Sequence, residues 1–326
     1  MLCINSTSGN PYFNLAAEEF LLRKSDQDIF MLYINEPSIV VGKHQNALSE
    51  INLDFVNRNN IKVARRLSGG GTVFHDFGNL NFCFIQTAKD KNLVNFSKYM
   101  RPIINVLKDL GLETVESKHN DILINGLKIS GNAEHVFKKR VLHHGTLLFD
   151  SKLDKLREAL KVSQGCFTDR SVQSRRSKVA NIVGFLKHPV SIENFRMKIF
   201  NHQLQSRSSA QLYVFSEEDL KEIELLVVEK FSTWDWNFGY SPKYEFRNST
   251  IIQQNKYEVL LNVEKGYIQQ ASFFKDGKED AGLRQLSVEL VNLRHFPNDI
   301  KKCLEFINVM NNKFILSNRE IKYLLH

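Results

Sequence analysis

The chain is poor in cysteine. Its 326 residues include four cysteines, Cys3, Cys83, Cys166 and Cys303, and no two of them stand at the spacing of a zinc site or a redox motif. The sequence therefore predicts neither a disulfide framework nor a structural zinc site, and it favours a reducing compartment.

Long apolar runs are also missing. None approaches the roughly 20 residues that a membrane helix needs. The first residues, 1–5, lack a basic region followed by a long apolar stretch, and they do not resemble an arginine-rich leader peptide. We therefore expect no membrane attachment and a cytoplasmic protein.

Charge of one sign is not gathered into tracts. The formal net charge is +8, from 44 basic and 36 acidic residues that are mixed along the chain. This excess favours acidic partners or phosphate-bearing substrates, but without a basic tract we expect no nucleic-acid binding. A hydrophobic content of 42% and a length beyond one ordinary core predict a globular protein with two unequal domains.

Local patterns predict most of the secondary structure. Asn10-Pro11 precedes apolar residues at helical spacing, which predicts a capped helix. Strands are expected at 29–34, 38–41 and 62–66, and at 80–84, where alternation predicts burial on one side only. We expect a helix at 96–110 whose start is limited by Pro102, a helix after Ser151 that this serine caps, helices at 191–204 and 217–231, and a hairpin at 257–274.

The segment Arg65-Arg66-Leu67-Ser68-Gly69-Gly70-Gly71 is the first candidate for chemistry. Three consecutive glycines let the backbone approach a ligand closely, and the two arginines suggest an anionic one. The segment lacks the spacing of a Walker A loop and of the dinucleotide fingerprint. A flexible turn remains the alternative interpretation.

A hairpin supplies the second candidate. Asn125-Gly126 predicts a two-residue turn between 121–124 and 127–130. In that register Asp121 faces Ser130 and Leu123 faces Lys128, so Asp121, Lys128 and Ser130 share one face while the isoleucines share the other. Lys128 could hold a phosphate and a carbonyl oxygen together. Taken alone, a lysine on a strand is usually just solvated.

Two further motifs are weaker. His143 and His144 are adjacent in a predicted strand, so at most one points into a given site, and the pattern taken alone favours a purely structural role for the pair. Cys166 could be a nucleophile or an ordinary loop thiol.

Together and in this order, these segments resemble the lipoate–protein ligase family. The likeness rests on 65–76 with Gly78-Asn79, on Asn120-Asp121 and Lys128-Ile129-Ser130-Gly131, and on the strand at 143–148. Weaker matches occur at 13–19, 41–46, 174–181 and 234–239. The resemblance implies an α+β fold (mixed α/β), in which a biotin/lipoate ligase-like catalytic domain at 1–245 has central mixed β-sheets flanked by helices. A small α+β accessory domain would follow at 246–326.

The resemblance also implies the reaction and its partners. ATP would activate free lipoate as lipoyl-AMP with Mg²⁺ present, and the lipoyl group would pass to a lysine of the acceptor. Acceptors would be lipoyl domains of 2-oxoacid dehydrogenase E2 subunits and the glycine-cleavage H protein. The enzyme would be a monomer and would belong to the long form of the family.

Site residues carry over by position. The lipoate pocket would use Arg66, Ser68, Gly69, Gly70, Gly71, His75 and His144. The nucleotide would contact Asn79, Asn120, Asp121, Lys128, Ser130, Gly131, Arg175 and Lys178, with Lys128 catalytic and Asp121 holding magnesium. Lys178 stands where the family often has arginine, which keeps the charge but loses a bidentate grip on phosphate.

Three alternatives stay open at this point. A lipoyl- or octanoyl-transferase would work through an acyl-cysteine at Cys166 without ATP activation. A transferase could also accept only preformed lipoyl-adenylate, and a catalytically silent relative could bind without turnover. Biotin ligation is disfavoured because the glycine segment and the His-His-Gly strand follow the lipoate pattern.

Overall fold

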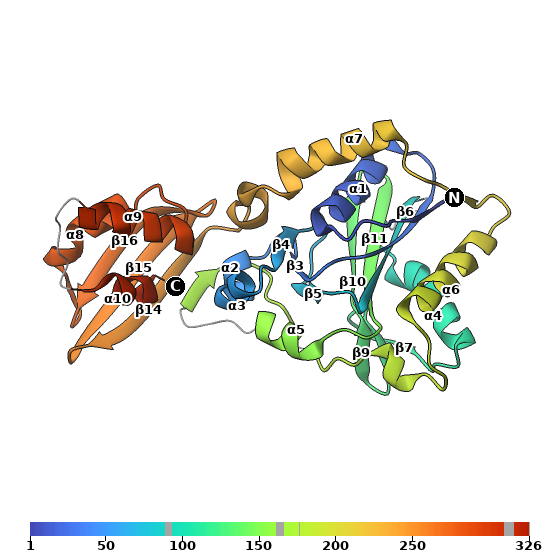
Figure 1. The fold of residues 1–326 in the computed structure, drawn as a ribbon, viewed down its shortest axis with the longest axis horizontal. Coiled ribbons are helices and arrows are strands. Elements are labelled where there is room, and N and C mark those ends of the chain that lie inside the picture. The colour runs from blue at the N-terminus through green and yellow to red at the C-terminus, as the bar shows by residue number, and fades with distance from the viewer. Residues whose placement is uncertain (89–92, 161–165, 176, 310–315, 326) are drawn as a thin grey trace. The chain divides into compact units, whose positions relative to one another are not determined.

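The computed structural model describes residues 1–88, 93–160, 166–175, 177–309 and 316–325 (Figure 1). Contacts divide the chain into two compact units. The first comprises Met1–Lys43, Asn52–Lys161 and Gln173–Thr233, and the second comprises His44–Ile51, Val162–Val172 and Trp234–His326. The boundary expected between residues 245 and 246 stays a prediction.

A six-stranded mixed sheet forms the centre of the first unit, in the order β10-β11-β6-β2-β1-β13. Parallel pairs join β2 to β1 and β1 to β13, and the remaining neighbours are antiparallel. The strands are β1 (Leu2–Asn5), β2 (Ile29–Ile34), β6 (Asn79–Thr87), β10 (Asn132–Phe137), β11 (Arg140–Leu148) and β13 (Gln211–Leu212).

Helices cover both faces of this sheet (Figure 1). On one face α4 (Phe96–Asp109) and α6 (Ile192–Gln205) pack on Leu80, Phe82 and Phe84 of β6. On the other face lie α1 (Pro11–Lys24) and α7 (Glu217–Leu226), and α7 continues as η2 (Val227–Phe231). The expectation that β6 is buried on one side only is wrong, because a central strand between two helical layers is covered on both faces.

Helix starts follow their caps. Asn10 accepts a hydrogen bond from the Tyr12 backbone N–H, and Pro11 is the first residue of α1, as predicted. In α4 the Asn95 side chain caps Lys98, and the helix runs through Pro102. The prediction that Pro102 limits the helix start is wrong, because a side-chain cap about two turns earlier begins the helix and the proline removes only one N–H from the interior.

The helix α5 (Leu153–Ala159) starts without the predicted cap from Ser151. Asn181 bonds both backbone groups of Ser151, donating to its carbonyl oxygen at 2.9 Å and accepting from its N–H at 3.1 Å. Asp76 accepts from the Lys152 N–H at 2.7 Å. Tertiary contacts therefore replace the local cap.

Two small sheets complete the first unit. One has the order β4-β3-β5, with β3 (Ser38–Val41), β4 (Lys62–Arg65) and β5 (Val73–His75), and its β4-to-β5 connection is the glycine segment. The other has the order β7-β8-β9, with β7 (Val115–Glu116), β8 (Ile122–Ile124) and β9 (Leu127–Ser130). The short helices are α3 (Leu53–Arg58) and η1 (Ile182–Phe185).

The second unit is a five-stranded antiparallel sheet, in the order β12-β14-β15-β16-β17, with helices packed on one hydrophobic core. The predicted hairpin is present as β15 and β16. The strands are β12 (Cys166–Asp169), β14 (Tyr244–Ile252), β15 (Asn255–Glu264), β16 (Tyr267–Lys275) and β17 (Lys278–Glu279), and the helices are α2 (Ala47–Glu50), η3 (Asp235–Gly239), η4 (Ala281–Leu283), α8 (Arg284–Glu289), α9 (Pro297–Val309) and α10 (Asn318–Leu324).

All four cysteines are free thiols. In the described part of the chain, no helix combines the length and the apolar character that a membrane crossing needs.

Candidate active site

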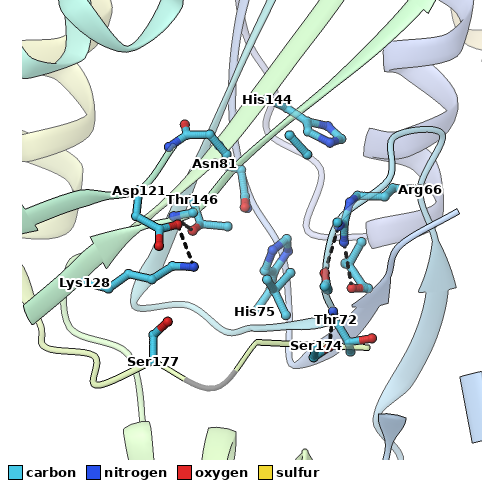
Figure 2. A pocket seen from close by; sticks show the side chains of 18 of the residues that line it. Arg66, Thr72, His75, Asn81, Asp121, Lys128, His144, Thr146, Ser174 and Ser177 are labelled. Carbon is cyan, nitrogen blue, oxygen red and sulfur yellow. Dashed lines mark hydrogen bonds and ion pairs between the residues drawn. The ribbon is translucent and has the colours of Figure 1, made fainter. Parts of the chain in front are cut away.

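A cavity of about 220 Å³ lies within the first unit (Figure 2). Its floor is the α1 side of the central sheet, where strand register aligns polar side chains. Tyr33 of β2 pairs with Asn81 of β6, which pairs with Thr146 of β11. Because side chains alternate along a strand, His144 shares this face with Thr146, while His143 faces α4 and contacts Glu134. At most one of the two histidines was predicted to point into a given site, and of the two only His144 lines this cavity.

The glycine segment forms one wall of the cavity, and Arg66 holds it in shape. The guanidinium Nη2 donates to the carbonyl oxygens of Gly69 at 2.6 Å and Gly71 at 2.8 Å, and Nη1 donates to Val40 at 3.1 Å. Arg65 is buried and donates to the carbonyl oxygens of Gly42 and Lys43. The arginines thus organise backbone, and burial lowers the pKa of Arg66 to about 10.

The three glycines have different roles. Gly70 has φ +85°, and a Cβ there would lie 3.1 Å from the Arg66 Nη2. A Cβ on Gly71 would lie 3.1 Å from the Ser174 Oγ, which accepts from the Thr72 N–H. At Gly69 no described atom would lie within 4 Å.

We therefore expect Gly70→Ala to lower the free energy of unfolding by about 1–2 kcal/mol, since an L-residue is strained at positive φ. Gly69→Ala serves as the matched control and should stay within about 0.5 kcal/mol of the parent. Urea denaturation followed by fluorescence compares the two. Equal midpoints would contradict the assignment of separate roles.

A buried series of hydrogen-bonded polar groups supports the wall that the glycine segment forms. Ser68 Oγ lies 2.6 Å from His144 Nε2 and accepts from Arg66 Nε at 3.0 Å. His144 Nδ1 lies 2.8 Å from Glu18 Oε2, and the Tyr33 hydroxyl donates to Glu18 Oε1 at 3.0 Å. The spacing resembles a nucleophile triad, but Ser68 is fully buried and does not line the cavity. The hydrogen bonds from Glu18 through His144 to Ser68 therefore orient Arg66 and the glycine wall.

The opposite wall comes from the β8–β9 hairpin. Asn125 and Gly126 both have positive φ, as the predicted turn requires. Lys128 Nζ lies 2.8 Å from Asp121 Oδ1, and Figure 2 shows both at the cavity edge. The hairpin thus brings the predicted pair together.

The predicted register is wrong in one place. Ile122 pairs with Ser130, because a bulge follows the Leu123–Lys128 pair. Ser130 is fully buried, and its hydroxyl accepts from the Asn132 side chain at 3.3 Å. The bulge turns Ser130 away from the face that carries Lys128.

The segment around Val179 fixes the backbone of Lys128. The Lys128 N–H donates to the Lys178 carbonyl at 2.9 Å, and the Ala180 N–H donates to the Lys128 carbonyl at 3.0 Å. Ser174, Arg175 and Ser177 line the cavity beyond it. Arg176, within the segment 174–181 that resembles the family, lies outside the described residues.

The sequence-predicted residues divide into two groups. Those that line the cavity are Arg66, Gly70, Gly71, His75, Asp121, Lys128, Gly131, His144 and Arg175. Those that the structure does not place in its lining are Ser68, Gly69, Asn79, Asn120, Ser130 and Lys178. Asn79 and Asn120 lie behind the lining and bond two of its residues, since Asn79 donates to Asn81 and the Asn120 carbonyl accepts from Asn132.

Sequence reasoning missed several residues of the cavity and its support. Glu18 and Tyr33 anchor His144, and Leu15, Thr72, Asn81, His119, Asn132, Thr146, Ser174 and Ser177 join the lining. Glu18 offered a signal, because an acidic residue amid the apolar face of α1 is expensive to bury without partners.

Among the described residues, the cavity lining offers a magnesium ion one carboxylate. Asp121 is a carboxylate on the wall, with Oδ1 paired to Lys128. Within the described residues no three histidine, cysteine or acidic side chains gather as a metal site. Magnesium in phosphate-transfer sites takes one or two carboxylates and fills its shell with water and phosphate oxygens. Asp121 therefore fits as one ligand of a shell that a bound triphosphate would complete.

Cys166, the alternative nucleophile, is exposed on β12 in the second unit. It is absent from the lining of this cavity.

Comparison with known families shows to which family the chain belongs. Residues 10–203 match the model of the lipoyl protein ligase A/B catalytic domain, and residues 241–325 match that of the bacterial lipoate protein ligase C-terminus. The chain belongs to the lipoate–protein ligase family. It is therefore an enzyme of the ligase class, and the predicted α+β fold with a C-terminal α+β part is confirmed.

Relatives within the lipoate–protein ligase family match along most of their length. Lipoate-protein ligase LplJ of Bacillus subtilis is 38% identical, over 94% of this chain and 93% of its own. Lipoate–protein ligase 1 of Staphylococcus aureus is 37% identical, over 92% of each chain.

Solved ligase structures have the same fold. LipL1 of P. falciparum in complex with lipoate has a TM-score of 0.63 and 25% identity, over 99% of this chain and 98% of its own. Lipoate-protein ligase A bound with ATP has a TM-score of 0.60 and 28% identity, over 73% and 98%. A bi-partite ligase from Thermoplasma acidophilum, studied with its E2 lipoyl domain, has a TM-score of 0.63 and 28% identity, over 73% and 96%.

Proposed function

We propose that the chain activates free lipoate with ATP and then transfers the lipoyl group to a lysine of an acceptor protein. The observation that carries the proposal is the cavity, whose apolar and glycine wall faces a lysine held by a carboxylate. Membership of the lipoate–protein ligase family and the similarity to ligases bound to lipoate and to ATP support it.

The reaction needs two steps because a carboxylate is a poor electrophile. In the first, a lipoate oxygen attacks the α-phosphorus of ATP, so a P–O bond forms to the acyl oxygen and the bond to pyrophosphate breaks. In the second, the acceptor amine attacks the acyl carbon, the bond to AMP breaks, and the amine loses a proton. The enzyme would supply positioning and cationic stabilisation.

Each wall has its own task in this proposal. Lys128 stabilises the charge that develops on the acyl and phosphate oxygens, and Asp121 orients Lys128. The Arg66-bonded glycine segment, with Ser68, His75 and His144, shapes the acyl end. The nucleotide end comprises Asp121, Gly131 and Arg175 of the lining, with Asn79, Asn120, Ser130 and Lys178 supporting it from outside the lining. Asp121 would hold the magnesium ion that screens the phosphate charge.

The acceptors in this proposal are lipoyl domains of 2-oxoacid dehydrogenase E2 subunits and the glycine-cleavage H protein. The Thermoplasma relative described with its E2 lipoyl domain supports this class of partner. The net charge of +8 suits an acidic acceptor surface. We place the reaction in the cytoplasm, where the four thiols would stay reduced, and propose a monomeric enzyme without nucleic-acid or membrane partners.

An exchange assay tests the proposal. We expect radiolabelled pyrophosphate to enter ATP in the presence of lipoate, more slowly with octanoate and not with biotin. Absence of exchange, with transfer from added lipoyl-AMP, would identify a transferase of preformed adenylate. Absence of exchange together with loss of octanoyl or lipoyl transfer in Cys166→Ala would identify an acyl-cysteine enzyme.

A further inference from the structure

His75 lines the cavity, and one of its buried ring nitrogens has no hydrogen-bond partner among the described residues. Its side chain is 4% exposed, and its ring projects into the cavity between Lys128 and Arg66 in Figure 2. Nδ1 has a partner, Asn35 Nδ2, at 2.9 Å. Nε2 is fully buried and has no partner among the described residues. Buried polar atoms are almost always paired, so a missing partner here points to a ligand atom.

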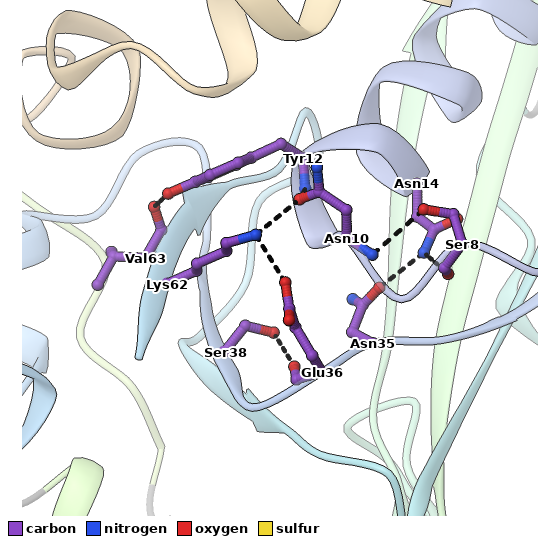
Figure 3. Close-up of polar contacts among 9 residues, drawn as sticks. All are labelled: Ser8, Asn10, Tyr12, Asn14, Asn35, Glu36, Ser38, Lys62 and Val63. Carbon is purple, nitrogen blue, oxygen red and sulfur yellow. Dashed lines mark hydrogen bonds and ion pairs between the residues drawn. The ribbon is translucent and has the colours of Figure 1, made fainter. Parts of the chain in front are cut away.

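The proton on this ring can be placed by following a chain of buried amides. Asn14 Nδ2 lies 2.8 Å from the carbonyl oxygen of Ser8, which only accepts, so this end of Asn14 is its nitrogen (Figure 3). The Ser6 hydroxyl donates to Asn14 Oδ1 at 2.8 Å. Asn14 Nδ2 also donates to Asn35 Oδ1 at 2.8 Å. The nitrogen end of Asn35 therefore faces His75.

The tautomer of His75 follows from this direction. Asn35 Nδ2 is a donor, so His75 Nδ1 must carry the lone pair. A neutral ring with a lone pair on Nδ1 has its proton on Nε2, the buried atom that has no partner among the described residues. Burial lowers the pKa of His75 to about 3, helped by Arg66 and His144, so the ring is neutral at physiological pH.

The hydrogen bonds that run from Ser6 through Asn14 and Asn35 to His75 form a relay, and its residues are held in fixed positions. Asn14 and Asn35 are fully buried, so water cannot reorient them. The Glu36 N–H donates to the Gly9 carbonyl, which holds the turn after Asn35 against the segment before α1. Lys62 of β4 pairs with the Glu36 carboxylate at 2.6 Å and holds the same turn by a second contact (Figure 3). His75 itself is held in β5, paired with Ser38 of β3.

The neighbouring polar groups of the wall already have partners. His144 bonds Glu18 and Ser68, and Asn81 bonds Tyr33 and Asn79. The His75 N–H is thus a preorganised donor for an acceptor atom of the bound substrate. A carboxyl oxygen accepts a much stronger hydrogen bond than a dithiolane sulfur, and a neutral donor holds a carboxylate without protonating it.

We propose that His75 donates a hydrogen bond from Nε2 to a carboxyl oxygen of the bound acyl substrate, and that Ser6, Asn14 and Asn35 are positioning residues that set this tautomer. The proposal rests on the lipoate-ligase function and adds a recognition contact opposite Lys128. The bond persists to the acyl carbonyl oxygen of the adenylate, so His75 would contribute to both half-reactions.

Nitrogen-15 spectra of histidine-labelled wild-type enzyme without substrate test the tautomer directly. We expect His75 to show a protonated Nε2 and an unprotonated Nδ1, unchanged from pH 5 to pH 8. A protonated Nδ1, or titration within this range, would overturn the proposal. This readout is independent of catalysis.

Substitutions test the contact with substrate. In lipoate-dependent pyrophosphate exchange, His75→Leu should lower kcat/KM for lipoate about 100-fold, the effect of losing one preorganised donor. His75→Gln should lose less than about tenfold, because its amide N–H reaches the position of Nε2–H. The KM for ATP should not change. Equal losses in the two variants would contradict the donor role.

The positioning role has its own test. Asn35→Asp keeps the oxygen that accepts from Asn14 but places an acceptor against His75 Nδ1, so the proton should move to Nδ1 and kcat/KM for lipoate should fall at least tenfold. Asn57→Asp, on the exposed side of α3, adds the same charge as a control and should leave both unchanged. An unmoved proton with full activity would overturn the relay. Wild-type enzyme without any lipoate-dependent exchange would instead refute the proposed function.

Discussion

Replacing Lys128 by alanine is expected to lower the rate of lipoate-dependent pyrophosphate exchange about 1,000-fold, the upper range for removing one preorganised electrostatic contact. The lysine reaches the cavity edge with its side chain 24% exposed, and Asp121 fixes its Nζ at 2.8 Å. Gly131 leaves room for it, because a Cβ there would lie 3.0 Å from Nζ. The measurement is the exchange rate at saturating ATP and lipoate.

The Lys128→Ala variant should remain folded. Removing a partly exposed ion pair costs about 0–1 kcal/mol, so the melting temperature should shift by only a few degrees. Lys139→Ala removes an exposed lysine next to the β10–β11 turn and should exchange at the parent rate. Lys128→Arg should recover only part of the activity, since a planar fork differs from a compact ammonium. Full activity in Lys128→Ala would refute the catalytic assignment.

Substituting alanine for Gly78 is expected to destabilise the fold by about 3 kcal/mol or more, beyond the usual cost of overpacking. A Cβ at this position would lie 2.0 Å from the Asp150 carbonyl oxygen and 2.6 Å from the Ser151 nitrogen. These are backbone atoms, and both Phe149 and Asp150 donate their N–H groups to the Gly78 carbonyl. The clash therefore cannot be relieved by turning a side chain.

Thermal unfolding compares Gly78→Ala with Gly184→Ala, a matched control where no described atom would lie within 4 Å of the new Cβ. We expect a large loss of melting temperature, or no soluble protein, for Gly78→Ala and a small shift for the control. Equal melting temperatures would show that the Asp76–Gly78 turn and the segment 149–151 can separate at little cost.

Elements whose signals are local could be predicted from the sequence. The Asn10-Pro11 start of α1 and the Asn125-Gly126 turn depend on neighbouring residues, so their patterns predict them correctly. The Lys128–Asp121 pair follows from that turn, since a two-residue loop sets the pairing next to it. One pair further along, the bulge moves Ser130 off the predicted face, and no local sequence pattern predicts this bulge.

The sequence is a poor guide where contacts with distant segments outweigh local preference. Ser151 does not cap α5 because Asn181, 30 residues away, bonds its backbone. The local pattern also does not show that the guanidinium groups of Arg65 and Arg66 bind carbonyl oxygens of β3 and of the loops beside it. A buried cation next to unsatisfied carbonyl oxygens is cheaper than one held free for a ligand.

The candidate site shows the same division. By itself the sequence determined the residue types of the family signature, the helix and strand periods, and the hairpin that carries Lys128, because these depend on residues a few positions apart. Only the tertiary structure decided that Glu18 of α1 meets His144 of β11 and that Asn14 and Asn35 set the proton of His75. Such contacts join elements far apart in sequence through strand register and helix packing, and no local pattern encodes which distant amide or carboxylate will satisfy a buried histidine.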